Sequence, residues 1–445
     1  MATDKLIKQM SKNLWLQLSA ALIIAVCLGI FIRLTALSVN AYWPTPAAVI
    51  YAGLFLFSML LLIAQRRFTT IMLLGAALCL SCAMYARVTM LSFQSSDYVH
   101  CLLPWVKKFE ELSLKEALST PVGDYNLPYL YYLIILSRTG WDDLLHIKSF
   151  SCFFDVILAY LVMRIISLEE KDSRIQLCSF LVVLITPTVM INSAQWAQCD
   201  SIYTTFCLLS IYAALRGRGR LCSISWTVAL CFKLQAVFIL PALCVAFFSG
   251  RIKLRHLFWV PTIYFLSSLP ALLAGRSLLS CMNIYGNQMG EYNKLFYNAP
   301  TIWRFFGASR PSEYNNMALF ISIAALIIFT LLCLSFCKKL NRQQLLRIFF
   351  ISALLAPYVL PRMHERYFYI PEILSIIYFF CDRKKWYIPV LLTLGSLTGY
   401  IQALIGDSVF DQLYFSIVYL IIIITETREL FRELWADTQK FFLPE

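Results

Sequence analysis

Long apolar stretches recur along this chain and alternate with short polar or basic segments. An α-helix needs about 20 predominantly apolar residues to cross the hydrocarbon core of a bilayer. The pattern therefore predicts a series of membrane helices, several of which are shorter than that. Their predicted ranges are residues 15–32, 47–64, 69–91, 150–166, 177–191, 202–215, 257–274, 317–336, 345–360, 370–381, 386–404 and 413–424.

A further stretch, between residues 220 and 251, predicts a helix that enters the membrane and returns. Basic residues flank it on both sides, and such residues collect on cytoplasmic loops. Both flanks are therefore expected on the same side. We expect the interruption at Lys233 to Gln235, with Pro241 in the second of two half-length helices. Broken helices are tolerated at membrane depth where they line a cavity or are buried in protein, so this tip should face polar groups.

Composition agrees with a membrane protein. Of the 445 residues, 60% are hydrophobic and 14% are charged, and the mean hydropathy is +0.70. A soluble domain has about 45–50% apolar and about 25% charged residues. We therefore predict an all-α polytopic membrane protein, a bundle of about 12–14 membrane helices of which some are short or re-entrant. No linker or low-complexity tract interrupts residues 1–445, which favours one integral domain.

The net charge of +13 changes this interpretation little. A basic chain can bind nucleic acid, but most of the 38 Lys and Arg fall on alternate loops and on the two tails. That distribution follows the positive-inside rule. We therefore expect both termini in the cytoplasm, a lipid bilayer as the main partner, and no nucleic acid.

This topology places two long polar segments on the extracytoplasmic side. In the first of them, residues 103–118 carry apolar side chains such as Val106 and Phe109 at the spacing of an amphipathic surface helix, and 127–136 is a second apolar stretch. The predicted parts are N-terminal spans 1–91, a first large outer loop 92–148, central spans 149–274, a second outer loop 275–316, and C-terminal spans with a cytoplasmic tail 317–445.

The cysteines and histidines do not suggest a metal centre. Most of the 15 Cys lie within apolar stretches, and only 4 His are present. The chain has no His-Glu-x-x-His motif and no phosphate-binding P-loop motif. We assign no metal ligands, and the interpretation requires no cofactor, although it does not exclude a divalent metal.

Two acidic residues of the first outer loop are candidates for a general base. Asp97 follows the third predicted span, and Asp124 stands in the polar and aromatic segment 123–129. A carboxylate can take a proton from an attacking hydroxyl. Each residue also has a structural alternative, because Asp97 fits a solvated loop and Asp124 fits a turn with a side-chain hydrogen bond. Both alternatives stay open.

A second group of polar residues stands between two predicted spans. Trp196, Asp200 and Tyr203 fall at i, i+4 and i+7, which predicts one stripe of a helix, with Gln195 and Gln198 beside it. An aromatic belt at the membrane surface would explain the Trp and the Tyr. It does not explain the two Gln and the Asp, so we count this segment as a candidate site.

Three cations are expected near the same membrane face. Lys233, at the tip of the broken helix, should meet an anion because an isolated charge there is costly. Arg362 and Arg366 flank Glu365 in a charged segment between two apolar helices. Anchoring of the helix ends is one explanation. The other is a site for an anionic headgroup, in which the arginines contact phosphate and Glu365 orients a hydroxyl.

An ordered set of these segments resembles a known group. The segments are Ser96-Asp97-Tyr98, Gly123-Asp124-Tyr125-Asn126 with Pro128-Tyr129, Gln198-x-Asp200-Ser201-x-Tyr203, Lys233-x-Gln235, Asn298-Ala299 with Ile302-Trp303, and Met363-His364-Glu365-Arg366-Tyr367-Phe368. Over residues 87–380 they resemble the glycosyltransferase class C superfamily, and within it the bacterial mannosyltransferase-like proteins related to GPI mannosyltransferase II.

The resemblance implies a glycosyltransferase that moves a monosaccharide, mannose or a similar hexose or pentose, from an undecaprenyl- or dolichyl-type phosphate donor to a glycan, lipid or protein acceptor. Transfer is expected on the extracytoplasmic face, with inversion. The catalytic base is expected at Asp97, with Asp124 as its rival, and the donor phosphate at Lys233, Arg362 and Arg366. Substrate contacts are expected from Tyr98, Tyr125, Asn126, Trp196, Gln198, Asp200, Tyr203, Gln235, Asn298, Trp303, His364, Glu365 and Tyr367.

A transporter or flippase for a lipid-linked sugar or another anionic substrate is the alternative, since it would also use broken helices and charges within the membrane. No internal repeat supports it, and the polar residues gather at one face, which favours an enzyme. The chain has no Asn-x-Ser/Thr sequon and no lysine-based retrieval signal. Both points favour a bacterial inner membrane over the endoplasmic reticulum.

Overall fold

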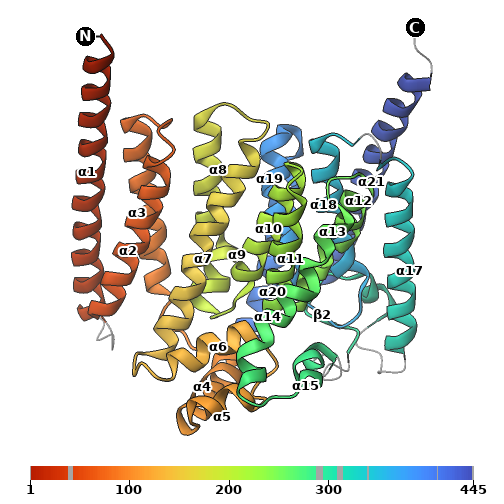
Figure 1. Ribbon diagram of the computed structural model, residues 1–445, viewed down its shortest axis with the longest axis horizontal. Helices are drawn as coiled ribbons and strands as arrows, with labels where there is room; N and C mark the ends of the chain where they lie inside the picture. The colour runs from red at the N-terminus through yellow and green to blue at the C-terminus, as the bar shows by residue number, and fades with distance from the viewer. Residues whose placement is uncertain are drawn as a thin grey trace. The chain divides into compact units, whose positions relative to one another are not determined.

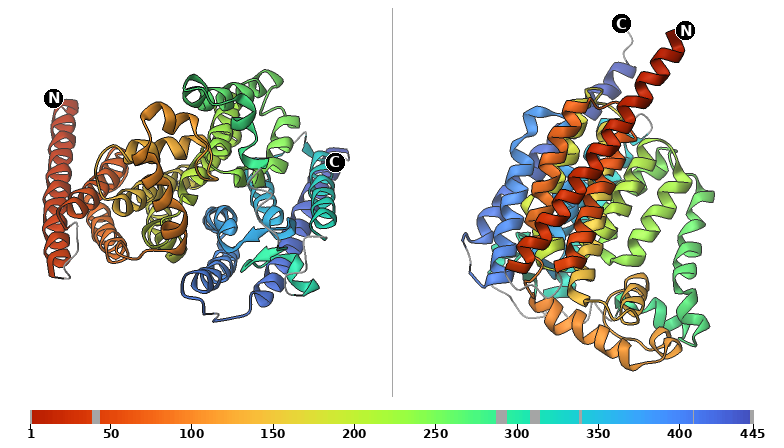
Figure 2. Two further views of the ribbon diagram at one scale, coloured as in Figure 1. Left: turned by 90° about the horizontal axis from the view of Figure 1, so that it is seen from below. Right: turned by 90° about the vertical axis from the view of Figure 1, so that its left-hand side faces the viewer.

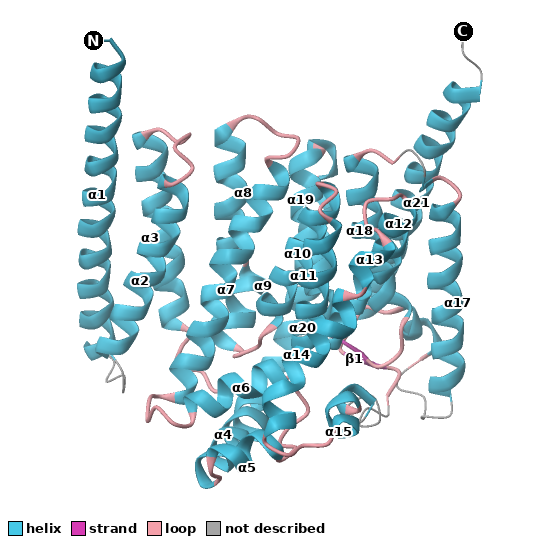
Figure 3. Cartoon of the chain, in the orientation of Figure 1, coloured by secondary structure: helices cyan, strands magenta, loops and turns pink. Residues whose placement is uncertain are grey.

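Almost all of the chain that the structure describes is helical. The computed structural model describes residues 2–38, 44–286, 294–307, 314–337, 340–407 and 409–442 (Figures 1 and 3). The one sheet among these residues consists of two short parallel strands, β1 (Phe296–Tyr297) and β2 (Met363–His364). Within the predicted second outer loop, residues 287–293 and 308–313 lie outside the described residues, as do the basic residues 338–339.

Seven of the described helices are long and apolar enough to cross a membrane, so the chain is an all-α, multi-pass membrane protein. A bent pair, Ser173–Ile185 with Pro187–Gln195, makes eight if its 50° bend lies within one span. The predicted class, an all-α polytopic membrane protein, is confirmed. The predicted number of about 12–14 membrane helices is larger because it includes helices too short to count as spans here. The seven are Leu14–Thr35, Pro44–Ile63, Thr70–Thr89, Asp143–Ile166, Leu254–Leu273, Asn315–Leu334 and Arg383–Ile405.

The chain divides into two compact units, which we describe separately. The first comprises residues 1–99 and 141–201. In it α1 lies against α2 (Figure 2), and α7 packs against α2, α8 and η2. Its elements are α1 (Ala2–Ser38), α2 (Pro44–Ile63), α3 (Thr70–Thr89), α7 (Asp143–Ile166), α8 (Ser173–Ile185), α9 (Pro187–Met190) and the π-helix η2 (Ile191–Gln195).

The second unit comprises residues 100–140 and 202–445. The π-helix η1 (Tyr98–Leu102) and α10 (Asp200–Leu215) begin in the first unit and continue into this one. The remaining elements are α4 (Leu103–Glu111), α5 (Leu114–Ser119), α6 (Leu127–Leu136), α11 (Gly219–Phe232), η3 (Leu234–Ile239), α12 (Leu240–Phe248), α13 (Leu254–Leu257), α14 (Trp259–Leu273), α15 (Leu278–Met282), η4 (Ile302–Phe306), α17 (Asn315–Leu334), α18 (Arg342–Val359), η7 (Glu365–Phe368), α19 (Tyr369–Cys381), η8 (Arg383–Lys385), α20 (Tyr387–Ile405) and α21 (Gln412–Phe442).

Helix α18 lies at the centre of the second unit. It packs against α12, α17, α19 and α21, and nearly all of its residues are buried. A helix that is apolar on all sides is expected to be covered on all sides. The 3-10 helix η3, which follows the helix break, also packs against α18.

The helix interruption predicted at Lys233 to Gln235 is confirmed. Helix α11 ends at Phe232, Lys233 has extended backbone (φ −153°, ψ 138°), and η3 begins at the next residue. Trp226 Nε1 donates to Ala236 O at 2.8 Å, which satisfies a carbonyl near the break. Pro241 lies in the first turn of α12, where its missing N–H costs nothing.

Three predicted boundaries are wrong. The surface helix predicted over 103–118 is two helices, because a capping box at Ser113 starts α5 anew. Helix α7 begins at Asp143, ahead of the start predicted at residue 150. The last helix extends to Phe442, well beyond the predicted end at 424, because charged residues continue its helical pattern past the apolar stretch.

Candidate substrate site

Asp97 lies in the segment that follows α3, and two side chains of the first unit hold its carboxylate. Trp196 Nε1 donates to Asp97 Oδ2 at 3.1 Å, and Gln198 Nε2 donates to the same oxygen at 2.5 Å. Asp97 is half-buried, whereas Trp196 and Gln198 are buried. Two neutral donors on one oxygen fix the orientation of a carboxylate, as a general base requires. The structure thus brings three predicted site residues together.

The residues next to Asp97 tie its segment to the same loop. Ser95 Oγ donates to Trp196 O at 2.7 Å, and the Tyr98 N–H donates to Ser95 Oγ at 3.2 Å. Burial, with smaller contributions from Asp143 and Asp142, raises the pKa of Tyr98 to about 12. Like an ordinary tyrosine, Tyr98 is neutral at physiological pH, and its phenol has a proton to donate in a hydrogen bond.

The predicted helical stripe of Trp196, Asp200 and Tyr203 is wrong. Trp196 follows the end of η2, Ala197 has a positive φ of 65°, and α10 begins only at Asp200. Asn192 Nδ2 donates to Asp200 Oδ2 at 2.8 Å across this loop. The helical period does not hold because the chain turns between the two helices, and this turn directs the indole of Trp196 to Asp97.

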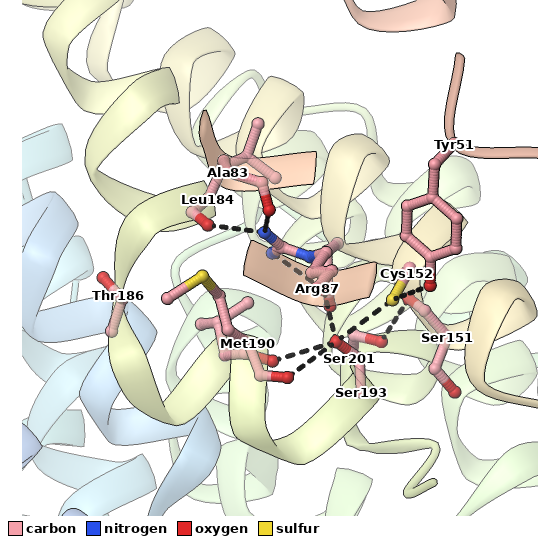
Figure 4. A network of polar contacts seen from close by, with 12 residues as sticks. Tyr51, Ala83, Arg87, Ser151, Cys152, Leu184, Thr186, Met190, Ser193 and Ser201 are labelled. Carbon is pink, nitrogen blue, oxygen red and sulfur yellow. Dashed lines mark hydrogen bonds and ion pairs between the residues drawn. The ribbon is translucent and has the colours of Figure 1, made fainter. Parts of the chain in front are cut away.

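A second acid of the first unit, Asp155, belongs to a buried network on the transmembrane helices. Figure 4 shows its partners Arg87 and Ser193 in that network. Arg87 Nη2 and Asp155 Oδ2 are 3.1 Å apart, and both side chains are fully buried. Ser193 Oγ donates to the same carboxylate oxygen at 2.6 Å, and Arg87 Nη1 donates to Leu184 O at 2.8 Å. These contacts join α3, α7, α8 and η2, so Asp155 has a structural role.

Lys148 supports the segment that carries Asp97. Its buried ammonium donates to Met90 O at 3.0 Å, to Leu91 O at 2.9 Å and to Phe93 O at 2.6 Å. These carbonyls belong to the end of α3 and the residues that follow it. Three charge-assisted hydrogen bonds fix the chain just before Asp97.

In the second unit, Lys233 lies at the helix break with its ammonium over two aromatic rings. Lys233 Nζ is 5.6 Å from the ring centroid of Tyr125 and 5.7 Å from that of Tyr203. Only 4% of Lys233 is exposed. Cation–π contacts of a desolvated ammonium contribute about 2 kcal/mol or more. Both contacts help to fix the position of the ammonium at the helix break.

The segment around Tyr125 is shaped by a close contact of Gly123. Gly123 has a φ of 71°, and a Cβ added there would lie 2.6 Å from the ring of Trp105. The ring of Tyr125 contacts Trp105 edge-on, with centroids 5.5 Å apart. Asn126 caps α6 through its side-chain oxygen, and Asp124 is half-buried between these residues. Tyr125 thereby reaches Lys233 from a rigid turn.

The two predicted segments around Asn298 and His364 meet at the small parallel sheet. Its register pairs Tyr297 with His364, and their rings stack with centroids 4.5 Å apart and an interplanar angle of 10°. Tyr367 contacts the ring of His364 edge-on at 5.2 Å. Segments far apart in the sequence therefore form one local structure, with Asn298 at the end of one strand.

Backbone strain marks the predicted segments. Four non-glycine residues among those described have positive φ: Arg66, Ala197, Asn298 and Arg362. The last three fall inside segments that the sequence analysis singles out. Such conformations cost about 1–3 kcal/mol each and persist where the surrounding structure imposes them, often at functional sites.

Glu365 and Asn298 pack against α20 at a glycine that sequence analysis missed. Glu365 is buried, and a Cβ added to Gly399 would lie 2.7 Å from Glu365 Cβ and 3.1 Å from Asn298 O. Gly395 and Gly399 form a Gly-x-x-x-Gly pattern in an apolar helix, the usual signal for such close approach. That pattern could have found the contact.

A cavity of about 260 Å³ lies beside η3 and the start of α17. Its lining includes the polar residues Gln235, Asn315, Arg362 and Tyr367, and the remaining wall is mostly apolar, including Phe238 and Leu319. The cavity thus combines a mostly apolar wall with a few polar residues, one of them an arginine. This is the chemistry of a site for an amphiphile with an anionic group.

The other predicted residues take different places. Lys233 and Arg366 do not line this cavity. Each directly precedes a residue that does: Lys233 precedes Leu234, and Arg366 precedes Tyr367. Trp303 Nε1 donates to Val359 O at 2.6 Å, so its indole anchors η4 to α18. Among the described residues, no three His, Cys, Asp or Glu side chains converge as metal ligands would.

The geometry defines a multi-pass membrane protein that carries an oriented carboxylate in one unit and an amphiphile-type cavity in the other. No protein-family model and no curated protein matches the chain.

Proposed function

We propose that the protein is a membrane glycosyltransferase that uses a polyprenyl-phosphate-linked monosaccharide as donor and transfers the sugar on the extracytoplasmic face. The observation that carries the proposal is the cavity lined by Arg362, Gln235 and apolar side chains. A polyprenyl-phosphate sugar joins a hydrocarbon chain, a phosphate and hydroxyl groups. Each of these parts has a matching group in the cavity wall.

Arg362 is suited to the donor phosphate. A guanidinium binds phosphate oxygens through paired N–H donors, and it stays charged in a partly apolar site. Gln235 is 6% exposed, and its side-chain oxygen has no hydrogen-bond partner among the described residues. A buried acceptor of this kind gains from a hydroxyl donor, which a sugar provides.

Lys233 and Arg366 extend this positive region in the proposal. Lys233 is held by Tyr125 and Tyr203, and Arg366 stands in η7 directly before the cavity residue Tyr367. Positive charge near the phosphate favours its departure as an anion.

Asp97 supplies the other half of the proposed reaction. The acceptor hydroxyl attacks the anomeric carbon and forms the new glycosidic bond while its proton passes to the carboxylate. The bond between the anomeric carbon and the phosphate oxygen breaks, and the polyprenyl phosphate leaves with the electron pair. Attack opposite the leaving group inverts the anomeric centre. Trp196 and Gln198 keep the carboxylate oriented for this step.

The proposal is tested with purified protein in sealed vesicles that contain a polyprenyl-phosphate mannose labelled in the sugar, together with a membrane extract as acceptor source. We expect label to appear on an acceptor and unlabelled polyprenyl phosphate to accumulate in equal amount. Movement of the intact labelled lipid across the bilayer, with no transfer, would instead identify a flippase.

A further inference from the structure

A second cavity, of about 530 Å³, lies at the beginning of α11. Five basic side chains line it: Arg218, Arg220, Lys253, Arg255 and His256. No Asp or Glu is among its lining residues, and none of these Arg and Lys side chains forms an ion pair within the described part of the chain. So many cations around one cavity repel one another unless an anion joins them.

The helix geometry adds to this positive potential. The N-terminal end of α11 carries partial positive charge and N–H groups without helical partners, and its first turn contains no acid. Arg218 is the N-cap residue, and Arg220 lies in the first turn. Basic residues are unfavourable at this end of a helix. A bound anion would offset this repulsion between the helix end and the side chains of Arg218 and Arg220.

The side chains in this cavity are arranged as donors. The Lys253 N–H donates to His256 Nδ1 at 3.1 Å, which leaves the proton of a neutral His256 on Nε2. Gly219 makes room for this ring, because a Cβ there would lie 2.3 Å from His256 Nδ1. The guanidinium of Arg220 lies over the ring of Trp259 at 4.5 Å, which fixes its position.

Apolar surface adjoins the basic cavity. Leu254 and Phe258 are 74% and 71% exposed, and the span that they begin has the lowest buried share of the seven. A further cavity of about 210 Å³, almost entirely apolar, is lined by residues of α11 and α12 and by residues near the start of the exposed span, including Trp226 and Leu257. A ligand that fits both cavities has an anionic head and a hydrocarbon tail.

We propose that the basic cavity at the start of α11 binds the phosphate headgroup of an anionic phospholipid, with an acyl chain in the neighbouring apolar cavity. Positive charge on cytoplasmic loops is a general topology signal. That signal does not require that the cations line one cavity or that Arg220 stack on Trp259. Basic pockets between membrane helices beside an apolar face are known to suit anionic headgroups.

This site is separate from the proposed reaction. It lies at the opposite end of α11 from Lys233, and a helix of this length extends about 21 Å. Lipid binding can therefore be measured whether or not glycosyl transfer is found.

The test is lipid retention by the full-length protein, measured by native mass spectrometry after exchange from detergent micelles doped with phosphatidylglycerol or phosphatidylcholine of equal chain length. We expect preferential retention of phosphatidylglycerol. In the variant Arg220→Gln/Arg255→Gln that preference should fall roughly 10–30-fold, since each cation near an anionic surface contributes about 1 kcal/mol. Both side chains are exposed, so the variant should fold.

The matched control removes two exposed cations from another loop, Arg383→Gln/Lys384→Gln, and should keep the preference. Equal loss in both double variants would show that only net charge matters and would overturn the site. Equal retention of the two lipids by the unmodified protein would also overturn it. If millimolar inorganic phosphate displaces phosphatidylglycerol or stabilises the protein as strongly, the ligand is a soluble phosphate and the lipid assignment is wrong.

Discussion

Two aspartates of the first unit sit in contrasting environments. Asp155 is completely buried, shares an oxygen with the guanidinium of Arg87, and connects transmembrane helices. Asp97 is half-buried in a loop segment, and its Oδ2 accepts from an indole and an amide, which carry no charge. In the sequence, Asp155 lies within a predicted span and Asp97 follows one. The surroundings of Asp155 give it a structural role, whereas the chemical role of Asp97 is our proposal.

The two aspartates show that the role of a carboxylate depends on the groups that contact it. A carboxylate paired with a guanidinium inside the protein is held by strong mutual attraction, and loss of one partner strands the other. A carboxylate oriented by neutral donors at a loop keeps its own charge and can accept a proton. Changes at Asp155 should therefore appear in stability, and changes at Asp97 in turnover.

The largest expected stability effect is at the buried ion pair. Arg87→Met leaves the carboxylate of Asp155 without its cation and should lower the free energy of unfolding by about 3–5 kcal/mol. The measurement is denaturant unfolding in mixed micelles. The double variant Arg87→Met/Asp155→Leu is the control and should recover most of the loss, because no charge is left unpaired. A single variant as stable as the parent would contradict the structural role.

Arg362 tests the cavity with a substitution that separates strain from binding. Arg362→Gly removes the guanidinium and relieves the positive φ of 65°, so donor use should fall by about 2–5 kcal/mol without a drop in melting temperature. Arg66→Gly makes the same change at a φ of 53° outside the cavity. It should keep donor use. Unchanged donor use in Arg362→Gly would remove Arg362 from the site.

The smallest effect is expected at Lys148, where a substitution should change both stability and turnover. Lys148→Met removes a buried donor from three carbonyls, one of which, that of Met90, also accepts from the Phe93 N–H, and should cost about 1–3 kcal/mol of stability. Turnover should fall as well, because the segment before Asp97 loses its support. Lys107→Met replaces an exposed lysine and should stay within about 0.5 kcal/mol. Loss of stability with full turnover would separate Lys148 from the site.

Local pattern predicts the helices well because apolar length is a local property. The start of α3 and the break at Lys233 follow directly from it. The break is predictable for a further reason: the positive-inside rule leads us to expect the basic residues on either side at the same membrane face. The apolar pattern predicts helix boundaries less well where a capping residue sets them. Apolar spacing alone predicts one continuous helix over 103–118, but the cap at Ser113 divides it.

The contacts of the site depend on residues far apart in the chain. Asp97 meets Trp196 and Gln198, and no periodicity brings them together; only the family resemblance places the three in one site. Arg87 is also missed by the sequence analysis. It stands within an apolar span, and its partner Asp155 lies on another helix, so its role follows only from packing.

The central claim, that Asp97 is the general base, is tested most directly by single-turnover transfer in Asp97→Asn with donor already bound. The asparagine keeps the shape of the side chain but cannot take a proton, so transfer should slow by about 10²–10⁴-fold. Donor affinity and melting temperature should stay close to those of the parent. Asp124→Asn should transfer at nearly the parent rate. Normal transfer in Asp97→Asn together with its loss in Asp124→Asn, both variants folded, would contradict the account and assign the chemistry to Asp124.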